Sequence, residues 1–298
     1  MGHVCEFRQA SAVSCGLMEK LQRNHYNLLP PTEQAAHRGD LDSAATGDLL
    51  AWMHETEADV HRAVGEALPA VELFIEALVP RMQAGGRLFY IGAGTSGRLG
   101  VVDASECPPT FGVDADLVVG LIAGGDGAIR TAVEGAEDDR EGGWRDLQVH
   151  GVTAADTLVG IAASGRTPYV VGGLAAARAQ GLLTAAIVCN PASAAAAAAE
   201  YAIEAVTGPE FVTGSTRLKA GTATKLLLNM ISTVTMIRLG RVVGNRMVDM
   251  KPANAKLIER GERMIVEATG ADAETAQKLL AAHGNVRAAI QAYAHTRR

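Results

Sequence analysis

The sequence predicts an α/β fold in which a parallel five-stranded sheet is sandwiched by helices. Five short apolar runs alternate with helical stretches between residues 87 and 206, which is the pattern of repeated βαβ units. Hydrophobic residues make up 48% of the 298 residues and aromatic residues only 4%, which is typical of parallel strands buried on both faces.

The expected strands span 87–91, 117–123, 157–162, 184–189 and 202–206, with helices between them near 96–105, 127–137 and 168–180. Upstream, helical patterning begins near Asp48 and continues through 68–82, where Pro69 is expected to open a second helix. Downstream, the alanine run 194–199 predicts a short helix and 221–243 a long apolar one. Residues 272–294 predict two or three short helices, a small C-terminal helical appendage.

Bulk properties exclude several classes of partner. The net charge of −6 gives no reason to expect nucleic acid or an anionic membrane surface, and no apolar run reaches the length of a membrane span. The four cysteines have no metal-ligand spacing and no secretory signal precedes them. We therefore expect a cytoplasmic protein with reduced thiols and no bound metal.

The first expected βα turn has the G-x-G-x-x-G spacing of a dinucleotide-binding loop, at residues 92–97. Its context argues against a dinucleotide. Pro108 and Pro109 are expected to end the following helix after about ten residues. The acids Asp114 and Asp116 also precede the next strand, whereas a ribose-binding acid would end it. NAD is therefore not expected.

A second turn of similar chemistry, Ser164-Gly165-Arg166-Thr167, follows the third expected strand. Two βα turns at the carboxyl ends of parallel strands can converge on one crevice. Their hydroxyl groups and the free N–H groups of helix N-termini suit a phosphate monoester. The alternative is that Ser96, Ser164 and Thr167 serve only as helix N-caps.

Longer blocks carry a resemblance to a known family. The paired turns are similar to the sugar isomerase (SIS) domain, a phosphosugar-binding α/β fold. Within it the chain resembles the N-acetylmuramic acid 6-phosphate etherase family over roughly residues 32–296. The blocks are GAGTSGRLGVVDASECPPTFG (92–112), GLIAGGDGAIRTAVEGAEDD (120–139), GIAASGRTPYVVGGL (160–174), CNPAS (189–193), GPEFVTGSTRLKAGTATKLLLNMIST (208–233) and GNRMVDMKPANAKL (244–257).

The resemblance implies a SIS-type catalytic domain over 32–268, after a flexible extension at 1–31 and before a small helical subdomain at 269–298. It also implies a homodimer that acts on a phosphosugar without a cofactor. The chain departs from the family after Thr32-Glu33-Gln34, where Ala35-Ala36-His37 replaces an expected Arg-Asn pair. The first thirty residues have no counterpart, and the C-terminal piece ends early.

The implied reaction removes the D-lactyl ether of N-acetylmuramic acid 6-phosphate to give N-acetylglucosamine 6-phosphate and D-lactate. In the ring-opened sugar, elimination needs a base for the C2 proton and an acid for the leaving alkoxide, and two carboxylates of different pKa can supply both. The resemblance assigns Glu106 as the acid and Glu137 as the base, although the two roles are interchangeable at this stage. Without it, Glu106 could cap a helix or pair with Arg98, and Glu137 could be a solvated helix end.

The resemblance implies a substrate-binding set that comprises Thr95, Ser96, Gly97, Ser164, Gly165, Arg166, Thr167, Glu210, Ser215 and Lys219. Before the long helix lie four donors, Ser215, Thr216, Arg217 and Lys219, which suit the lactyl carboxylate or sugar hydroxyls. The alternative is a capped helix start with a solvated Lys. Cys107 is expected to be a small buried residue.

Two rival functions remain open. A SIS aldose–ketose isomerase would leave C3 intact, and a non-catalytic phosphosugar sensor would release nothing.

Overall fold

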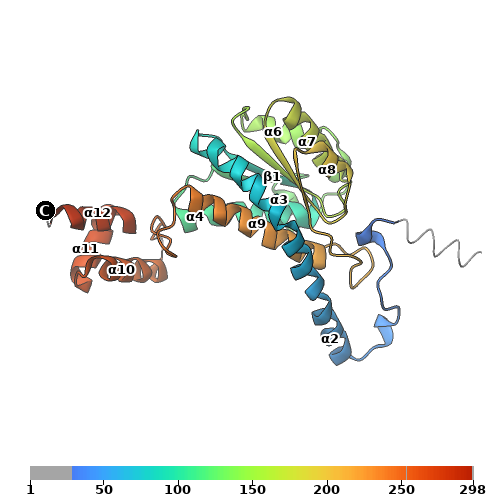
Figure 1. Ribbon diagram of the computed structural model, residues 1–298, viewed down its shortest axis with the longest axis horizontal. Coiled ribbons are helices and arrows are strands. Elements are labelled where there is room, and N and C mark those ends of the chain that lie inside the picture. The colour runs from blue at the N-terminus through green and yellow to red at the C-terminus, as the bar shows by residue number, and fades with distance from the viewer. Residues whose placement is uncertain (1–28, 253, 297–298) are drawn as a thin grey trace, which may run out of the picture.

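A parallel sheet of five strands in the order β2-β1-β3-β4-β5 forms the centre of the molecule. The computed structural model describes residues 29–252 and 254–296 (Figure 1). The strands are β1 (Leu88–Gly92), β2 (Val118–Ile122), β3 (Thr157–Ile161), β4 (Leu183–Val188) and β5 (Tyr201–Glu204). Each lies close to its expected position, and the predicted five-stranded parallel α/β sheet is confirmed.

Helices cover both faces of the sheet because successive strand residues point to opposite sides. In β1, Leu88 and Tyr90 pack toward α3 (Ala58–Gln83), α4 (Gly94–Phe111) and α9 (Lys219–Arg238). Phe89 and Ile91 pack toward α6 (Gly142–Val149), α7 (Pro168–Ala179) and α8 (Ala194–Ala198). The result is the predicted sandwich, with two apolar layers on either side of the strands.

Glycines bring α4 unusually close to the strands beneath it. A Cβ atom on Gly97 would lie 2.6 Å from the carbonyl oxygen of Gly92, and one on Gly120 would lie 2.6 Å from the Cα of Val101. Side chains at these positions would therefore push the helix away. In this loop Gly92 and Gly97 serve helix–strand packing, which sets the N-terminus of α4 at the carboxyl end of β1.

The predicted early end of the helix after the first loop is wrong. Helix α4 runs for 18 residues through Pro108 and Pro109 and ends at Phe111. The next residue, Gly112, has φ of 65° and donates its N–H to the carbonyl of Pro108. Both prolines lie in the last turn, where Cys107 and Phe111 are buried and hold the helix on the sheet. The helix length is therefore no argument against a dinucleotide.

Two other helix predictions also need correction. Pro69 does not open a helix but lies inside the 26-residue α3, which follows α2 (Thr46–Thr56) and buries an apolar stripe. The expected helix over 127–137 stops after one turn, α5 (Gly127–Arg130). Gly135 then adopts φ of 75° before the 3₁₀ turn η3 (Ala136–Asp138), so this segment is mostly a loop.

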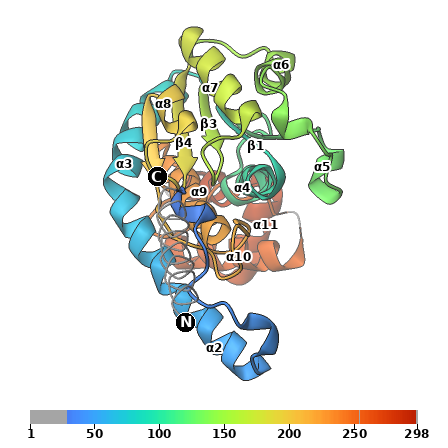
Figure 2. The same cartoon turned by 90° about the vertical axis from the view of Figure 1, so that its right-hand side faces the viewer.

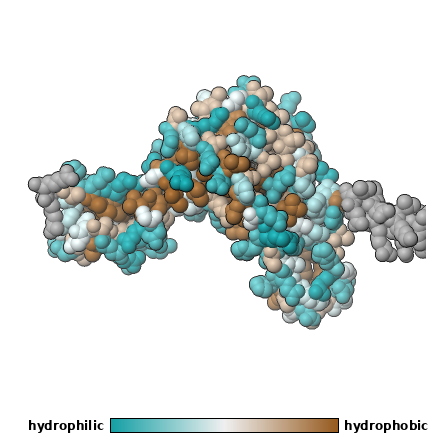
Figure 3. Space-filling view, in the orientation of Figure 1, coloured by the Kyte–Doolittle hydropathy of each residue, from teal (hydrophilic) through white to brown (hydrophobic). Residues whose placement is uncertain are grey.

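Three C-terminal helices stand apart from the sandwich in Figure 1, and Figure 3 shows hydrophobic residues in a stripe along them. They are α10 (Ala255–Thr269), α11 (Ala273–His283) and α12 (Val286–Thr296). Their own apolar cluster also contains Val248 and Met250. The helical unit thus begins before the predicted boundary at 269, and the division of the chain into domains stays a prediction.

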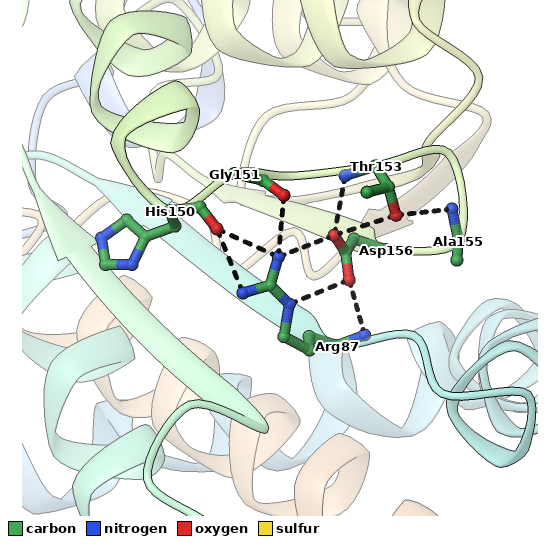
Figure 4. A network of polar contacts seen from close by, with 6 residues as sticks. All are labelled: Arg87, His150, Gly151, Thr153, Ala155 and Asp156. Carbon is green, nitrogen blue, oxygen red and sulfur yellow. Dashed lines mark hydrogen bonds and ion pairs between the residues drawn. The ribbon is translucent and has the colours of Figure 1, made fainter.

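A polar network ties β1 to β3 at their N-terminal ends (Figure 4). Arg87 donates from Nε and Nη2 to the carboxylate of Asp156, at 3.1 and 3.0 Å, and its backbone N–H donates to the same carboxylate at 2.8 Å. The N–H of Thr153 adds a bond of 2.8 Å. Burial alone would raise the pKa of Asp156, but these donors and the guanidinium charge lower it. This network stabilises the edge of the sheet that lies opposite the candidate site.

Candidate functional site

A cavity of about 210 Å³ opens at the carboxyl ends of β1 and β3, where parallel sheets bind ligands. We call it the main cavity. It is lined by Glu33, Ala93, Gly94, Thr95, Ser96, Glu137, Ala162, Ala163, Ser164, Thr167, Thr216, Gly221 and Thr224. The structure therefore brings both hydroxyl-rich turns to one hollow, as their duplicated sequence predicts.

The second turn is fixed by its glycine. Gly165 has φ of 67°, and a Cβ atom there would lie 2.2 Å from the Oγ of Ser193. The Oγ of Ser164 accepts the N–H of Arg166 at 3.3 Å, and Thr167 precedes α7 without a capping hydrogen bond from its side chain. The hydroxyl of Thr167 is therefore not used as an N-cap. Gly165 and Arg166 shape the turn but do not line the cavity.

In the first turn Thr95 and Ser96 line the main cavity, while Gly97 lies beneath them against β1. The position that precedes α4 is Ala93, so Ser96 belongs to the first turn of the helix and is not its N-cap. Free N–H groups at the start of α4 thus face the same hollow as the hydroxyls.

Glu137 lies on the wall of the main cavity, in η3. Its loop is held by Arg98 of α4, whose Nε and Nη2 donate to the carbonyl oxygens of Ile129 and Ala128, both at 2.8 Å. Helix α5 consequently lies beside α4 (Figure 2). Arg98 is thus a support for the loop that carries Glu137, and no ion pair between Arg98 and Glu106 forms.

Glu106 does not reach this cavity within one chain. It is exposed on α4, twelve residues after Gly94, which corresponds to about 18 Å along a helix. It lines neither the main cavity nor its neighbour. An acid and a base that act on one sugar must reach one site, and Glu106 and Glu137 do not do so within a single chain. The role of Glu106 stays a prediction.

Glu210 and Lys219 form the start of α9. The carboxylate of Glu210 accepts the N–H groups of Lys219 and Ala220 at 2.9 and 3.0 Å, and burial raises its pKa. The Nζ of Lys219 is buried and lies 2.9 Å from Oδ2 of Asp59 on α3. The helix start is capped, as the alternative reading of the sequence expected, but the solvated lysine of that alternative is wrong because Lys219 is buried and paired.

Neither Glu210, Lys219 nor the half-buried Ser215 lines the main cavity. Thr216, Gly221 and Thr224 from the same segment do line it. Of these, only Thr216 was among the donors expected before the long helix. Substrate contacts by Glu210, Ser215 and Lys219 stay predictions.

Glu33 is the carboxylate that sequence reasoning missed. It lies in η1 (Pro31–Glu33), and the arm that carries it docks through Thr32. The N–H of Thr32 donates to Oδ1 of Asn190 at 3.0 Å, and Nδ2 of Asn190 donates to Oγ1 of Thr32 at 2.8 Å and to the carbonyl of Ser164 at 3.2 Å. One buried amide thus joins the N-terminal arm to the second turn. Two sequence features could have pointed to Glu33: the Thr32-Glu33-Gln34 motif that contains it, and the CNPAS block that contains Asn190.

Other reactive groups lie away from the cavity. Burial, with the charges of Asp103 and Glu106, raises the pKa of the Cys107 thiol to about 12, which makes it a poor nucleophile. Asp103 is itself buried and accepts the hydroxyl groups of Tyr90 and Ser232, both at 3.1 Å. Among residues 29–252 and 254–296, no group of three or more His, Cys, Asp or Glu side chains is placed to bind a metal ion. None of the helices in these ranges combines the length and the hydropathy of a transmembrane span.

Comparison with known proteins finds a matching family model, curated relatives and solved structures. The family described as the glucokinase regulatory protein N-terminal SIS domain matches residues 70–178. An N-acetylmuramic acid 6-phosphate etherase from Christiangramia forsetii is 54% identical over 90% of this chain and 98% of its own length. The etherase from Cronobacter sakazakii is 57% identical over 81% of each chain. A solved phosphoheptose isomerase from Francisella tularensis aligns with a TM-score of 0.48 at 17% identity, over 65% of this chain and 100% of that one.

Proposed function

The chain belongs to the N-acetylmuramic acid 6-phosphate etherase family, and on that premise we propose that it cleaves the D-lactyl ether of N-acetylmuramic acid 6-phosphate. The products are N-acetylglucosamine 6-phosphate and D-lactate. The observation that carries the proposal is the main cavity, where two hydroxyl-rich turns for a phosphate share one hollow with the carboxylate of Glu137. We also propose a cytoplasmic location, where charged sugar phosphates are retained.

The phosphate binds at the paired turns. The hydroxyls of Ser96, Ser164 and Thr167 donate to its oxygens, and the N-termini of α4 and α7 supply free N–H groups and the positive ends of two helix dipoles. The sugar then extends toward the wall that carries Glu137.

The chemistry proceeds through the ring-opened aldehyde, in which the C2 proton is acidic. Glu137 takes that proton, the C–H electron pair forms the C2=C3 double bond, and the C3–O bond breaks. The leaving lactate oxygen receives a proton from Glu106. Water then adds to C3 and a proton returns to C2, so that both carboxyl groups regain their starting states.

Glu106 can play this part only in the cavity of a second copy. It shares one exposed face of α4 with Val102, four residues earlier, whose side chain is 52% exposed. Val234 and Ile237 are also exposed on the neighbouring α9. A partner that covered this apolar face would receive the Glu106 carboxylate, which supports a homodimer with shared sites.

The test uses two inactive variants, Glu106→Gln and Glu137→Gln, because Gln keeps the shape of Glu and removes its titration. Alone, Glu106→Gln releases almost no D-lactate but still exchanges the C2 hydrogen with solvent deuterium, whereas Glu137→Gln loses both. Co-refolded in equal amounts, the two variants form mixed dimers and recover about one quarter of wild-type activity, since half of the dimers contain one intact site of two.

Three outcomes separate the alternatives. No recovery on mixing would place Glu106 and Glu137 in the same chain's site. Exchange retained in Glu137→Gln and lost in Glu106→Gln would reverse the two roles. Wild-type lactate release in both variants would end the two-carboxylate mechanism, and a wild-type protein that binds the sugar without releasing lactate would be a sensor.

A further inference from the structure

A second cavity of about 200 Å³ adjoins the main one, and we call it the side cavity. Ala93, Gly94 and Glu137 line both cavities. A ligand that fills the main cavity and touches Glu137 therefore lies at the boundary between the two. No step of the proposed reaction uses the side cavity.

The walls of the side cavity are mainly methyl groups. Ala123 and Ala128 are buried at its base, and Val133, whose side chain is 48% exposed, lies on the loop above. That loop sits close to the strand end because Gly124, with φ of 89°, leaves room for Val133, whose Cβ would lie 2.8 Å from a Cβ at position 124. A small apolar group would cover Val133 and displace water from these methyl groups.

The charges at this cavity disfavour an anion. Two acidic residues, Glu134 and Glu137, line it together with one cation, Arg98, so its lining carries a net negative charge. The Nε and Nη2 groups of Arg98 already donate to the carbonyl oxygens of Ile129 and Ala128, so they are not free to bind a carboxylate. A lactyl carboxylate placed here would therefore meet more negative than positive charge. An uncharged acyl group meets no such penalty.

The substrate has one uncharged acyl group, and it is attached to the carbon at which Glu137 acts. C2 carries both the proton that Glu137 removes and the nitrogen of the acetamido group. We propose that the side cavity binds the N-acetyl group and thereby selects sugars with a short N-acyl substituent at C2. The proposal rests on the proposed function, which places C2 beside Glu137.

Binding of two sugar phosphates that lack the lactyl group tests this proposal without any turnover. N-acetylglucosamine 6-phosphate and glucose 6-phosphate share the ring and the phosphate and differ at C2, where neither is charged. Titration calorimetry on the wild-type protein should show about tenfold tighter binding of the N-acetyl sugar, which is the usual worth of one group in an apolar pocket.

Ala132→Leu fills the side cavity from its exposed loop and should reduce the preference to less than about twofold, with glucose 6-phosphate binding unchanged. Ala132→Ser is the matched control and should keep the preference. Val133→Ala enlarges the cavity and should improve binding of N-propionylglucosamine 6-phosphate relative to the N-acetyl sugar, a gain that a misfolded protein would not show.

Equal wild-type affinities for the two sugar phosphates, or a preference for the N-acetyl sugar that survives Ala132→Leu, would overturn the acetyl assignment. If that preference survives while KM for the lactyl substrate rises, the lactyl group occupies the side cavity instead. A protein that shows the predicted preference but releases no D-lactate would instead refute the proposed function alone.

Discussion

One buried side chain, Asn190, makes both hydrogen bonds that hold Thr32 of the N-terminal arm, and Asn190→Ala should loosen the arm. Further along the arm, the N–H of Ala36 donates to Oγ1 of Thr213 at 2.9 Å, and this bond is left intact. Asn190 is buried at the end of β4 and makes three hydrogen bonds, two to Thr32 and one to the carbonyl of Ser164. Alanine removes all three and leaves the buried N–H of Thr32 without its acceptor. Glu33, the next residue, would then lose its position in the main cavity.

The magnitude follows from the number of bonds. The net contribution of one hydrogen bond to stability is about 1 kcal/mol, so loss of the two bonds to Thr32 should reduce the free energy of docking by about 2 kcal/mol. This shifts the ratio of docked to undocked arms by roughly 30-fold. Thr32→Val keeps the backbone bond and the shape of the side chain, so it should cost about half as much.

Amide hydrogen exchange at Thr32 reports docking directly, since its N–H is protected only by Asn190. We expect roughly 30-fold faster exchange in Asn190→Ala, a smaller increase in Thr32→Val, and a loss of kcat/KM for the phosphosugar. Gln34→Ala is the control, because its side chain bonds only to Leu29 within the arm. Unchanged exchange at Thr32 in a folded Asn190→Ala protein would refute the docking mechanism.

Two further outcomes are expected from the geometry. Ser164→Ala removes a hydroxyl of the phosphate site, so KM should rise about tenfold with little change in kcat, and an unaltered KM would contradict the paired-turn site. Asp156→Ala breaks the pair with Arg87 and should lower the free energy of unfolding by about 3 kcal/mol at pH 7 in urea titrations. Because the folded pKa of Asp156 is lowered, its contribution is complete above the unfolded pKa and is lost as pH falls through the folded value. The difference between wild type and variant should therefore shrink below about pH 4, and a constant difference would exclude the ionised pair as its source.

The strands were predictable because each is a short apolar run bounded by turn residues. Strands β1, β3 and β4 are buried along their whole length, so nearly every residue must be apolar or small. The two hydroxyl turns were predictable for a related reason. Once the strands are parallel, turns that follow them must lie at one edge of the sheet, and the structure places Ser96 and Ser164 in one cavity there.

The helix ends were less predictable, since tertiary contacts override local preference. Pro69 costs α3 a hydrogen bond, but packing of Val71, Phe74 and Leu78 against the core outweighs it. In the segment that carries Glu137, a tertiary contact ends a helix instead of extending it. The apolar residues of this segment predict a helix, but Arg98 binds the carbonyl groups of Ala128 and Ile129, with which α5 ends.

Residues that arrive from distant segments were not predictable from spacing. Thr32 and Asn190 are 158 positions apart, and no local pattern connects them. Glu106 is a different case. In the sequence, Glu106 follows the first hydroxyl-rich turn after only a few residues. In the structure these residues form the 18-residue helix α4, which places Glu106 far from that turn, so closeness in sequence did not predict closeness in space.

The main cavity offers a phosphate hydroxyl groups and helix N-termini rather than cationic side chains. Among the described residues that line it there is no Lys or Arg. The buried Lys219 is paired with Asp59, and Arg98 lines the adjoining side cavity, where it donates to the carbonyl oxygens of Ala128 and Ile129. A helix N-terminus attracts an anion through its free N–H groups and through a dipole that acts within about a turn. Because the two N-termini at this cavity follow β1 and β3, the parallel sheet itself positions the groups proposed to bind the phosphate, on the same cavity whose wall carries Glu137.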